Sequence, residues 1–285
     1  MPTSLSRTSL IAVNPAELPV ASCTGVRRRD GGGLRGGPGQ TGFGSLFVSR
    51  RSDYSRSVST FAFIPGAGGS TWPWSRLTPL LVDAGHDTIA VELPGHDPTA
   101  GLPRYTELVV DAISSQTDIV LVAGSLGGFT APLVCERVAV RELVLINAMI
   151  PHPGETAHDW WANTGALAAQ DEAARVGDYG PFNEATYFLH DLDPEVAGEG
   201  ELYQRPEADL VFGSVCDFKA WPAIGIRVLV GQDDRFFPIG LQRKVARDRL
   251  GVEIDVLPGG HLLPLAQPRQ VADYLLETCR PDDVR

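Results

Sequence analysis

Short apolar runs alternate with longer amphipathic segments from Ser59 onward. Apolar runs of this length are typical of buried strands, and the amphipathic segments are typical of helices. The expected strands are 61–64, 88–92, 119–123, 142–146, 227–230 and 252–257, and the expected helices are 72–84, 105–115, 126–138, 239–249 and 268–279. Strands that alternate with helices are joined by right-handed crossovers. We therefore predict an α/β fold, with a mostly parallel sheet covered by helices on both faces.

One segment, at about 148–222, interrupts this alternation and shows no strand-like pattern. It is too long for a plain loop, and it holds fourteen acidic residues against Arg175, Arg205 and Lys219. We predict a helical cap insertion over the carboxyl ends of the strands. Trp160 and Trp161 in this segment are candidates to line a substrate pocket or to form the core of the cap.

The first 57 residues differ in composition from the rest. They contain nine Gly, nine Ser and eight Arg, and they show no sustained hydrophobic period. We predict a flexible Gly/Ser/Arg-rich extension at 1–57, followed by one domain at 58–285.

Charge and cysteine content narrow the class of protein. The chain of 285 residues has a net charge of −11, with the acidic excess in the predicted domain, so nucleic-acid binding is not expected. The sequence contains no run of eighteen apolar residues, so we expect no membrane-spanning helix. The four cysteines have neither metal-like spacing nor the pattern of a disulfide framework, which favours a reducing, cytoplasmic location.

A serine lies between a predicted strand and a predicted helix. The sequence around it is Ala123-Gly124-Ser125-Leu126-Gly127-Gly128. Small neighbours allow the backbone a tight turn that projects the Ser125 hydroxyl above the sheet. The same turn directs the Leu126 N–H toward an oxyanion at the helix N-terminus. The pattern predicts a nucleophile, although a serine that caps the following helix is the alternative.

An acid and an imidazole follow two later strands. Asp233 and Asp234 come after the strand that ends at Val230, and His261 comes after the strand that ends at Leu257. All of them fall on the edge of the sheet where ligands bind in open α/β folds. The chain order Ser…Asp…His is that of a hydrolase triad on such a sheet.

Together these residues resemble the α/β-hydrolase family, and most closely its methylesterase and hydroxynitrile lyase branch. The matching segments are PGAGGSTWPW at 65–74, LLVDAGH at 80–86, ELPGH at 92–96, DRFFP at 234–238 and HLLPL at 261–265. The resemblance covers about 59–285 and implies an α/β-hydrolase fold with a helical cap.

Carried over position by position, the resemblance makes Ser125 the nucleophile, His261 the base and Asp234 the acid. The backbone N–H groups of Ala67 and Leu126 would form the oxyanion hole. The spacing Gly-x-x-Asp-x-x-x-Pro selects Asp234 over Asp233. Trp72, in the segment after the oxyanion loop, joins Trp160 and Trp161 as a candidate pocket residue.

Two positions depart from the family pattern. Gly124 stands where a larger residue, often histidine, precedes the nucleophile, and Pro65 stands where histidine usually opens the oxyanion loop. The nucleophile position survives both changes. A further histidine, in His190-Asp191, reaches the site only if the cap folds back over it.

The expected activity is hydrolysis of a small or medium apolar ester through an acyl-enzyme, without cofactor or metal. The same triad also supports lyase chemistry on C–C bonds, and some relatives in this fold are small-molecule-binding proteins. A dinucleotide-binding unit at 61–92 is a weaker alternative, because Thr71 replaces the third glycine and Trp72 and Trp74 crowd the start of the helix. The sequence predicts neither the natural substrate nor the oligomeric state.

Overall fold

The computed structural model describes residues 58–279, so the extension predicted at 1–57 lies outside the described residues. Six parallel strands form one sheet in the order β2-β1-β3-β4-β5-β6. They are β1 (Thr60–Ile64), β2 (Asp87–Ala90), β3 (Ile119–Gly124), β4 (Glu142–Ile146), β5 (Gly225–Gly231) and β6 (Ile254–Leu257). The predicted α/β fold is confirmed.

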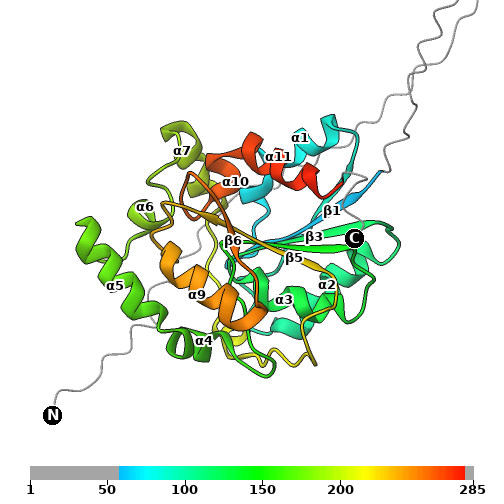
Figure 1. The fold of residues 1–285 in the computed structure, drawn as a ribbon, viewed down its shortest axis with the longest axis horizontal. Coiled ribbons are helices and arrows are strands. Elements are labelled where there is room, and N and C mark those ends of the chain that lie inside the picture. The colour runs from blue at the N-terminus through cyan, green and yellow to red at the C-terminus, as the bar shows by residue number, and fades with distance from the viewer. Residues whose placement is uncertain (1–57, 280–285) are drawn as a thin grey trace, which may run out of the picture. The chain divides into compact units, whose positions relative to one another are not determined.

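Helices cover both faces of this sheet (Figure 1). The short η1 (Trp72–Trp74), α1 (Thr78–Asp83), α10 (Leu263–Ala266) and α11 (Pro268–Glu277) lie on one face, and α2 (Leu102–Ile113), α3 (Gly127–Cys135) and α9 (Ile239–Leu250) on the other. Within residues 58–279, no helix has both the length and the apolar character needed to cross a membrane.

The two-sided core explains why the strands are apolar throughout. Phe61 and Phe63 of β1 pack with Leu81 of α1, whereas Ala62 and Ile64 face the opposite core. A strand that is covered on both faces buries every side chain, so its sequence shows a continuous apolar run rather than alternation.

Prolines explain where the helices depart from prediction. The helix expected at 72–84 is divided into η1 and α1, and Pro73 and Pro79 lie in the first turns of these two elements. Proline has no N–H and is accommodated best in the first turn of a helix. For the same reason α2 begins at Leu102, with Pro103 in its first turn, rather than at the predicted residue 105.

Five further helices occupy the segment between β4 and β5, where the cap was predicted. They are α4 (Ala157–Thr164), α5 (Ala166–Gly177), α6 (Glu184–Tyr187), α7 (Pro194–Tyr203) and α8 (Asp209–Gly213). An isolated antiparallel bridge pairs Thr156 with Val215, so the two ends of this segment lie together.

A buried ion pair fixes the start of this cap to α9. The side chains of Glu155 and Arg249 are 3% and 5% exposed, and a second guanidinium contact joins Arg249 Nη1 to the Ile150 carbonyl at 2.6 Å. Burial acts to raise the pKa of Glu155, but hydrogen bonds from Arg249, Asn163 and His152 outweigh it and leave that pKa below its ordinary value.

We predict that Arg249→Leu lowers the free energy of unfolding by about 3–5 kcal/mol, because it leaves the Glu155 carboxylate buried without its cation. Urea unfolding at pH 7 measures this change. Arg247→Leu is the matched control in the same helical turn; its side chain is 60% exposed, and we expect a change within about 1 kcal/mol. Equal losses in the two variants would contradict the structural importance of the buried pair.

Candidate active site

Ser125 occupies the turn between β3 and α3 in a strained backbone conformation. Its φ is +49°, in the left-handed region that residues with a side chain rarely adopt. The Ser125 carbonyl accepts hydrogen bonds from Gly128 N at 3.2 Å and Met149 N at 2.9 Å, which hold the turn. A side chain at Gly128 would collide with the Met149 carbonyl, so glycine is required there.

The three residues from the sequence pattern meet at the carboxyl edge of the sheet. His261 Nε2 lies 3.1 Å from Ser125 Oγ, and His261 Nδ1 lies 2.9 Å from Asp234 Oδ2. His261 is 6% exposed and Asp234 is 4% exposed. Because the carboxylate accepts from Nδ1, the unprotonated Nε2 of a neutral imidazole faces the serine hydroxyl.

The structure also separates the two neighbouring aspartates. Asp234 Oδ1 accepts from Phe236 N at 2.8 Å and from Phe237 N at 2.9 Å, which orients its other oxygen toward His261. Asp233 is exposed, and it accepts a hydrogen bond from Gly259 N at 3.3 Å. The imidazole therefore contacts the acid that the spacing selected.

A buried residue that the sequence pattern did not single out connects the loops of this site. Asn147 directly follows β4; its Nδ2 donates to the Gly260 and His261 carbonyls at 3.0 and 2.9 Å, and its Oδ1 accepts from Gly231 N at 2.8 Å. Gln242 of α9 donates to both Asn147 Oδ1 and Asp234 Oδ2. The position of Asn147, one residue beyond the buried strand β4, was the signal in the sequence that could have identified it as a site residue.

The loop at 65–69 packs directly against the serine. A Cβ on Gly66 would lie 2.8 Å from Ser125 Cβ, so this loop and the turn at Ser125 are in close contact. Within residues 58–279, neither Ala67 N–H nor Leu126 N–H has a protein acceptor. Both amides are therefore available to a ligand atom beside Ser125.

Aromatic rings surround the imidazole. The ring centroids of Phe188, Phe236 and Phe237 lie 5.1, 5.1 and 5.3 Å from that of His261. These three phenylalanines were not among the predicted pocket residues, although two of them follow Asp234 closely in the sequence.

The predicted pocket residues Trp160 and Trp161 lie behind this layer. Trp161 packs on Phe236 and Phe237, with ring centroids 5.4 and 5.6 Å away. Trp160 is 2% exposed, and its indole N–H donates to the Ile150 carbonyl at 3.1 Å. Both side chains therefore support the phenylalanines that contact His261.

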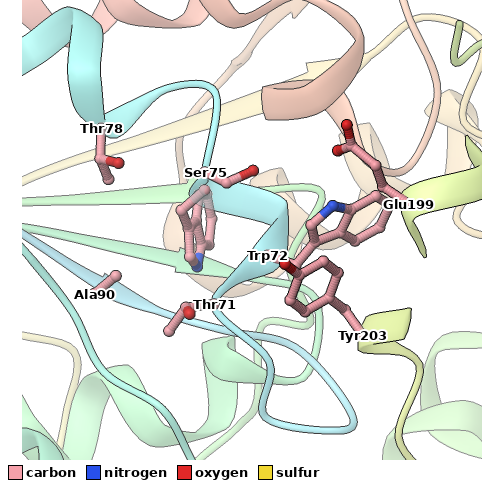
Figure 2. Close-up of a pocket in the computed structure, with 8 residues that line it drawn as sticks. Thr71, Trp72, Ser75, Thr78, Ala90, Glu199 and Tyr203 are labelled. Carbon is pink, nitrogen blue, oxygen red and sulfur yellow. The ribbon is translucent and has the colours of Figure 1, made fainter. Parts of the chain in front are cut away.

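Trp72 lines a cavity of about 460 Å³ whose lining does not include the triad residues (Figure 2). Tyr203 of α7 stacks on its ring at 6.1 Å. Trp74 lines the same cavity, and its ring explains one departure from the family pattern. A Cβ on Gly124 would lie 3.1 Å from the Trp74 ring, which fills the space that a larger residue before the nucleophile would need.

The cap reaches the histidine loop through Asp191. Its Oδ2 accepts from Gly260 N, the residue before His261, at 2.5 Å. Burial lowers the pKa of the adjacent His190, with the nearby Asp191 acting in the opposite direction.

Among residues 58–279, no group of three or more His, Cys, Asp or Glu side chains is arranged to hold a metal ion.

Comparison with known proteins shows similarity to one family of proteins. A model of the alpha/beta hydrolase family matches residues 61–274. Norfluorocurarine synthase 1 of a Strychnos species is 21% identical over 249 residues, which cover 76% of this chain and 94% of that protein. Alpha-hydroxynitrile lyase of Arabidopsis thaliana is 30% identical over 110 residues, covering 34% and 42%.

An esterase resembles the chain in both sequence and structure. Polyneuridine aldehyde esterase of Rauvolfia serpentina is 22% identical over 255 residues, which cover 76% of this chain and 94% of that protein. A solved structure of polyneuridine aldehyde esterase has a TM-score of 0.64 at 19% identity, over 79% of this chain and 100% of that one. The likeness between the two structures shows that they share a fold.

We predict that Asn147→Ala lowers the free energy of unfolding by about 2–4 kcal/mol, because it leaves two carbonyls of the histidine loop and the amide at the end of β5 without their partner. Chemical denaturation measures the loss. Asn163→Ala is the control, since Asn163 is exposed and donates one hydrogen bond, to Glu155. We expect the control to lose about 1 kcal/mol or less, and a loss that matches that of Asn147→Ala would refute the connecting role.

Proposed function

This chain belongs to the alpha/beta hydrolase family, and from that premise we propose that it is a serine hydrolase of small or medium apolar esters. The observation that carries the proposal is the row of hydrogen bonds from Ser125 Oγ through His261 to Asp234, at 3.1 and 2.9 Å. A serine hydroxyl needs a base to remove its proton, and the base needs an acid to orient it and stabilise its charged form.

In the proposed acylation step, Ser125 Oγ attacks the ester carbonyl while its proton moves to His261 Nε2. The carbonyl π electrons move to the oxygen, and a tetrahedral oxyanion forms. When the C–O bond to the alcohol breaks, His261 returns the proton to the departing alkoxide. Water, deprotonated by the same imidazole, then attacks the acyl-enzyme and releases the carboxylic acid and free Ser125.

The oxyanion would be held by the N–H groups of Ala67 and Leu126. Both N–H groups lie beside Ser125, and Leu126 also lies at the N-terminal end of α3, where the helix dipole favours negative charge. Donors that are fixed before the reaction stabilise the charge as it develops, without reorganisation.

The surroundings of His261 favour an apolar substrate. Phe188, Phe236 and Phe237 present hydrocarbon surface next to the imidazole. The cap at 148–222 carries a large acidic excess, which repels anionic substrates such as phosphates. An ester is the preferred substrate class because a relative of nearly the same length is named an esterase. The proposed reaction uses the three triad side chains, the two backbone N–H groups of the oxyanion hole and water.

A lyase is the alternative, since another relative is named an alpha-hydroxynitrile lyase. In the cyanohydrin lyases of the branch that this chain resembles, a lysine often lies in the pocket. The two lysines of this sequence, Lys219 and Lys244, are both exposed, and Lys244 pairs with Asp248 on the surface of α9. Hydrolysis therefore has the better support.

We predict that a fluorophosphonate adds once to the wild-type protein and not to Ser125→Ala, because phosphonylation requires an activated serine. Intact-mass spectrometry of the two folded proteins measures this. Turnover of a p-nitrophenyl butyrate substrate is expected to fall by at least about 10⁴-fold in Ser125→Ala. An adduct on both proteins, or on neither, would contradict the proposed nucleophile.

We predict that Asp234→Asn lowers kcat by about 10³–10⁴-fold, because the amide no longer holds the productive tautomer of His261. Asp233→Asn is the matched control, with an expected loss of less than about tenfold, since an exposed residue outside the triad contributes little. Steady-state kinetics on the same ester compares them. A larger loss in the Asp233 variant would reassign the acid.

A further inference from the structure

The buried carboxylate of Glu207, a residue of the cap, contacts the backbone of the loop at 65–69. Glu207 is 8% exposed. Its Oε2 accepts from Gly68 N at 2.7 Å, and its Oε1 accepts from the Tyr105 hydroxyl of α2 at 2.5 Å. The triad makes no use of this group, yet burying a carboxylate is costly unless its oxygens are satisfied. Its contacts therefore indicate a specific role.

The hydrogen-bonded amide is adjacent to the proposed oxyanion hole. Gly68 N belongs to the peptide that joins Ala67 to Gly68. Because a peptide unit is planar, a carboxylate that fixes the Gly68 N–H also fixes the carbonyl of Ala67 and restricts rotation about the Ala67 backbone. The direction of the Ala67 N–H then depends on the hold that Glu207 has on the next peptide.

This part of the loop has little stiffness of its own. Gly68 has a φ of +83°, which glycine adopts without the steric cost that other residues incur. A Cβ there would lie 2.6 Å from the Arg205 carbonyl, so the cap backbone passes directly over the glycine. Contact with the cap therefore acts together with the turn hydrogen bond from Gly69 N to the Gly66 carbonyl, at 3.2 Å, to fix this conformation.

Neighbouring contacts keep the carboxylate in register with the loop. Ala208 N donates to the Gly95 carbonyl at 2.6 Å, and Arg205 is ion-paired with Glu92. Glu92 in turn accepts from Thr71 N at 3.0 Å, further along the same loop. Beyond Thr71, Trp72 stacks on Tyr203 of the cap (Figure 2). On one side of Glu207 the cap segment therefore contacts the loop that holds Gly68, through Glu92 and Trp72, and on the other side it is hydrogen-bonded to Gly95 of the loop after β2.

We propose that Glu207 is a positioning residue for the oxyanion hole, which acts through Gly68 to fix the Ala67 N–H toward the reacting carbonyl. This inference rests on the proposed hydrolase function and adds a residue from the cap to it. The carboxylate does not touch the substrate; it sets the geometry of a donor that does.

Ionisation of Glu207 gives the role a pH signature. Burial raises the pKa of Glu207 to about 7, against hydrogen bonds from Tyr105, Gly68 and Ala208 that favour the ionised form. Charged or titratable groups on the neighbouring elements are Asp97, which lies near Tyr105, His96 and Arg104, which act on Asp97, and the Arg205–Glu92 pair. Above pH 7 the carboxylate is fully charged and accepts hydrogen bonds from Gly68 N and from the Tyr105 hydroxyl. Below pH 7 a proton occupies one oxygen and the hold weakens.

Two substitutions at Glu207 separate positioning from simple loss of a side chain. Glu207→Ala removes the acceptor. We expect kcat for p-nitrophenyl butyrate to fall about 10–100-fold, less than the loss of a donor itself, with KM changed by less than about threefold. Glu207→Gln keeps a carbonyl oxygen for Gly68 N and should rescue most of the loss at pH 6. The ratio of wild-type to Gln kcat should rise as pH passes 7.

Glu201 offers the matched control. It is an exposed glutamate of α7 in the same cap, and Glu201→Ala should leave kcat and its pH profile unchanged. A Glu207→Ala variant that folds and retains wild-type kcat would overturn the proposal, and so would a wild-type-to-Gln ratio that is flat from pH 6 to 8.5.

Amide hydrogen exchange across residues 64–72 tests the contact without relying on turnover. We expect faster exchange at Gly68 in Glu207→Ala than in wild type or in Glu207→Gln; an unchanged rate would overturn the proposal even in an inactive chain. Wild-type protein that fails to react with a fluorophosphonate would instead contradict the hydrolase function. The two failures are therefore distinguishable.

Discussion

The buried side chain of Asn147 joins the parts of the site that come from different strands. It needs both an amide donor and an amide acceptor, because it donates to two carbonyls of the histidine loop and accepts from the amide at the end of β5. Gln242 bridges the same oxygen to Asp234. An aspartate of the same shape lacks the donor, and a leucine lacks both. The mutual position of Asp234 and His261 thus depends on one amide group at the end of β4.

The register of the sheet brings Asn147 and Ser125 together. Gly124 of β3 pairs with Ile146 of β4, so the next residue on each strand leaves the sheet at the same level. Both adopt the left-handed region, with φ of +49° at Ser125 and +44° at Asn147. Each such residue costs about 1–3 kcal/mol, and the buried hydrogen bonds of the two turns offset that cost. The nucleophile turn and the connecting amide are therefore stabilised as one unit.

Local patterns predicted the elements and the three polar residues at the strand ends. Ser125, Asp234 and His261 each follow a recognisable strand, and parallel topology alone brings strand ends to one edge. The division of the helix at 72–84 was also encoded, in Pro73 and Pro79, and was missed because the apolar period continues across both. Contacts of the cap were beyond prediction for a different reason. Glu207 meets Gly68 across 139 residues of sequence, and no local propensity records such a distance.

The acidity of the cap has an internal part as well as a surface part. Glu155 is paired with a guanidinium, whereas Asp191 and Glu207 each accept a backbone N–H from one of the two loops that flank Ser125, and Glu207 also accepts from the Tyr105 hydroxyl. Composition counts these carboxylates with the surface charge that repels anions, but hydrogen bonding makes them acceptors that the loops require. Because one acidic side chain holds the loop before His261 and another holds the loop after Ala67, a displacement of the cap changes both sides of the site. The position of the cap and the geometry of the loops around Ser125 therefore vary together.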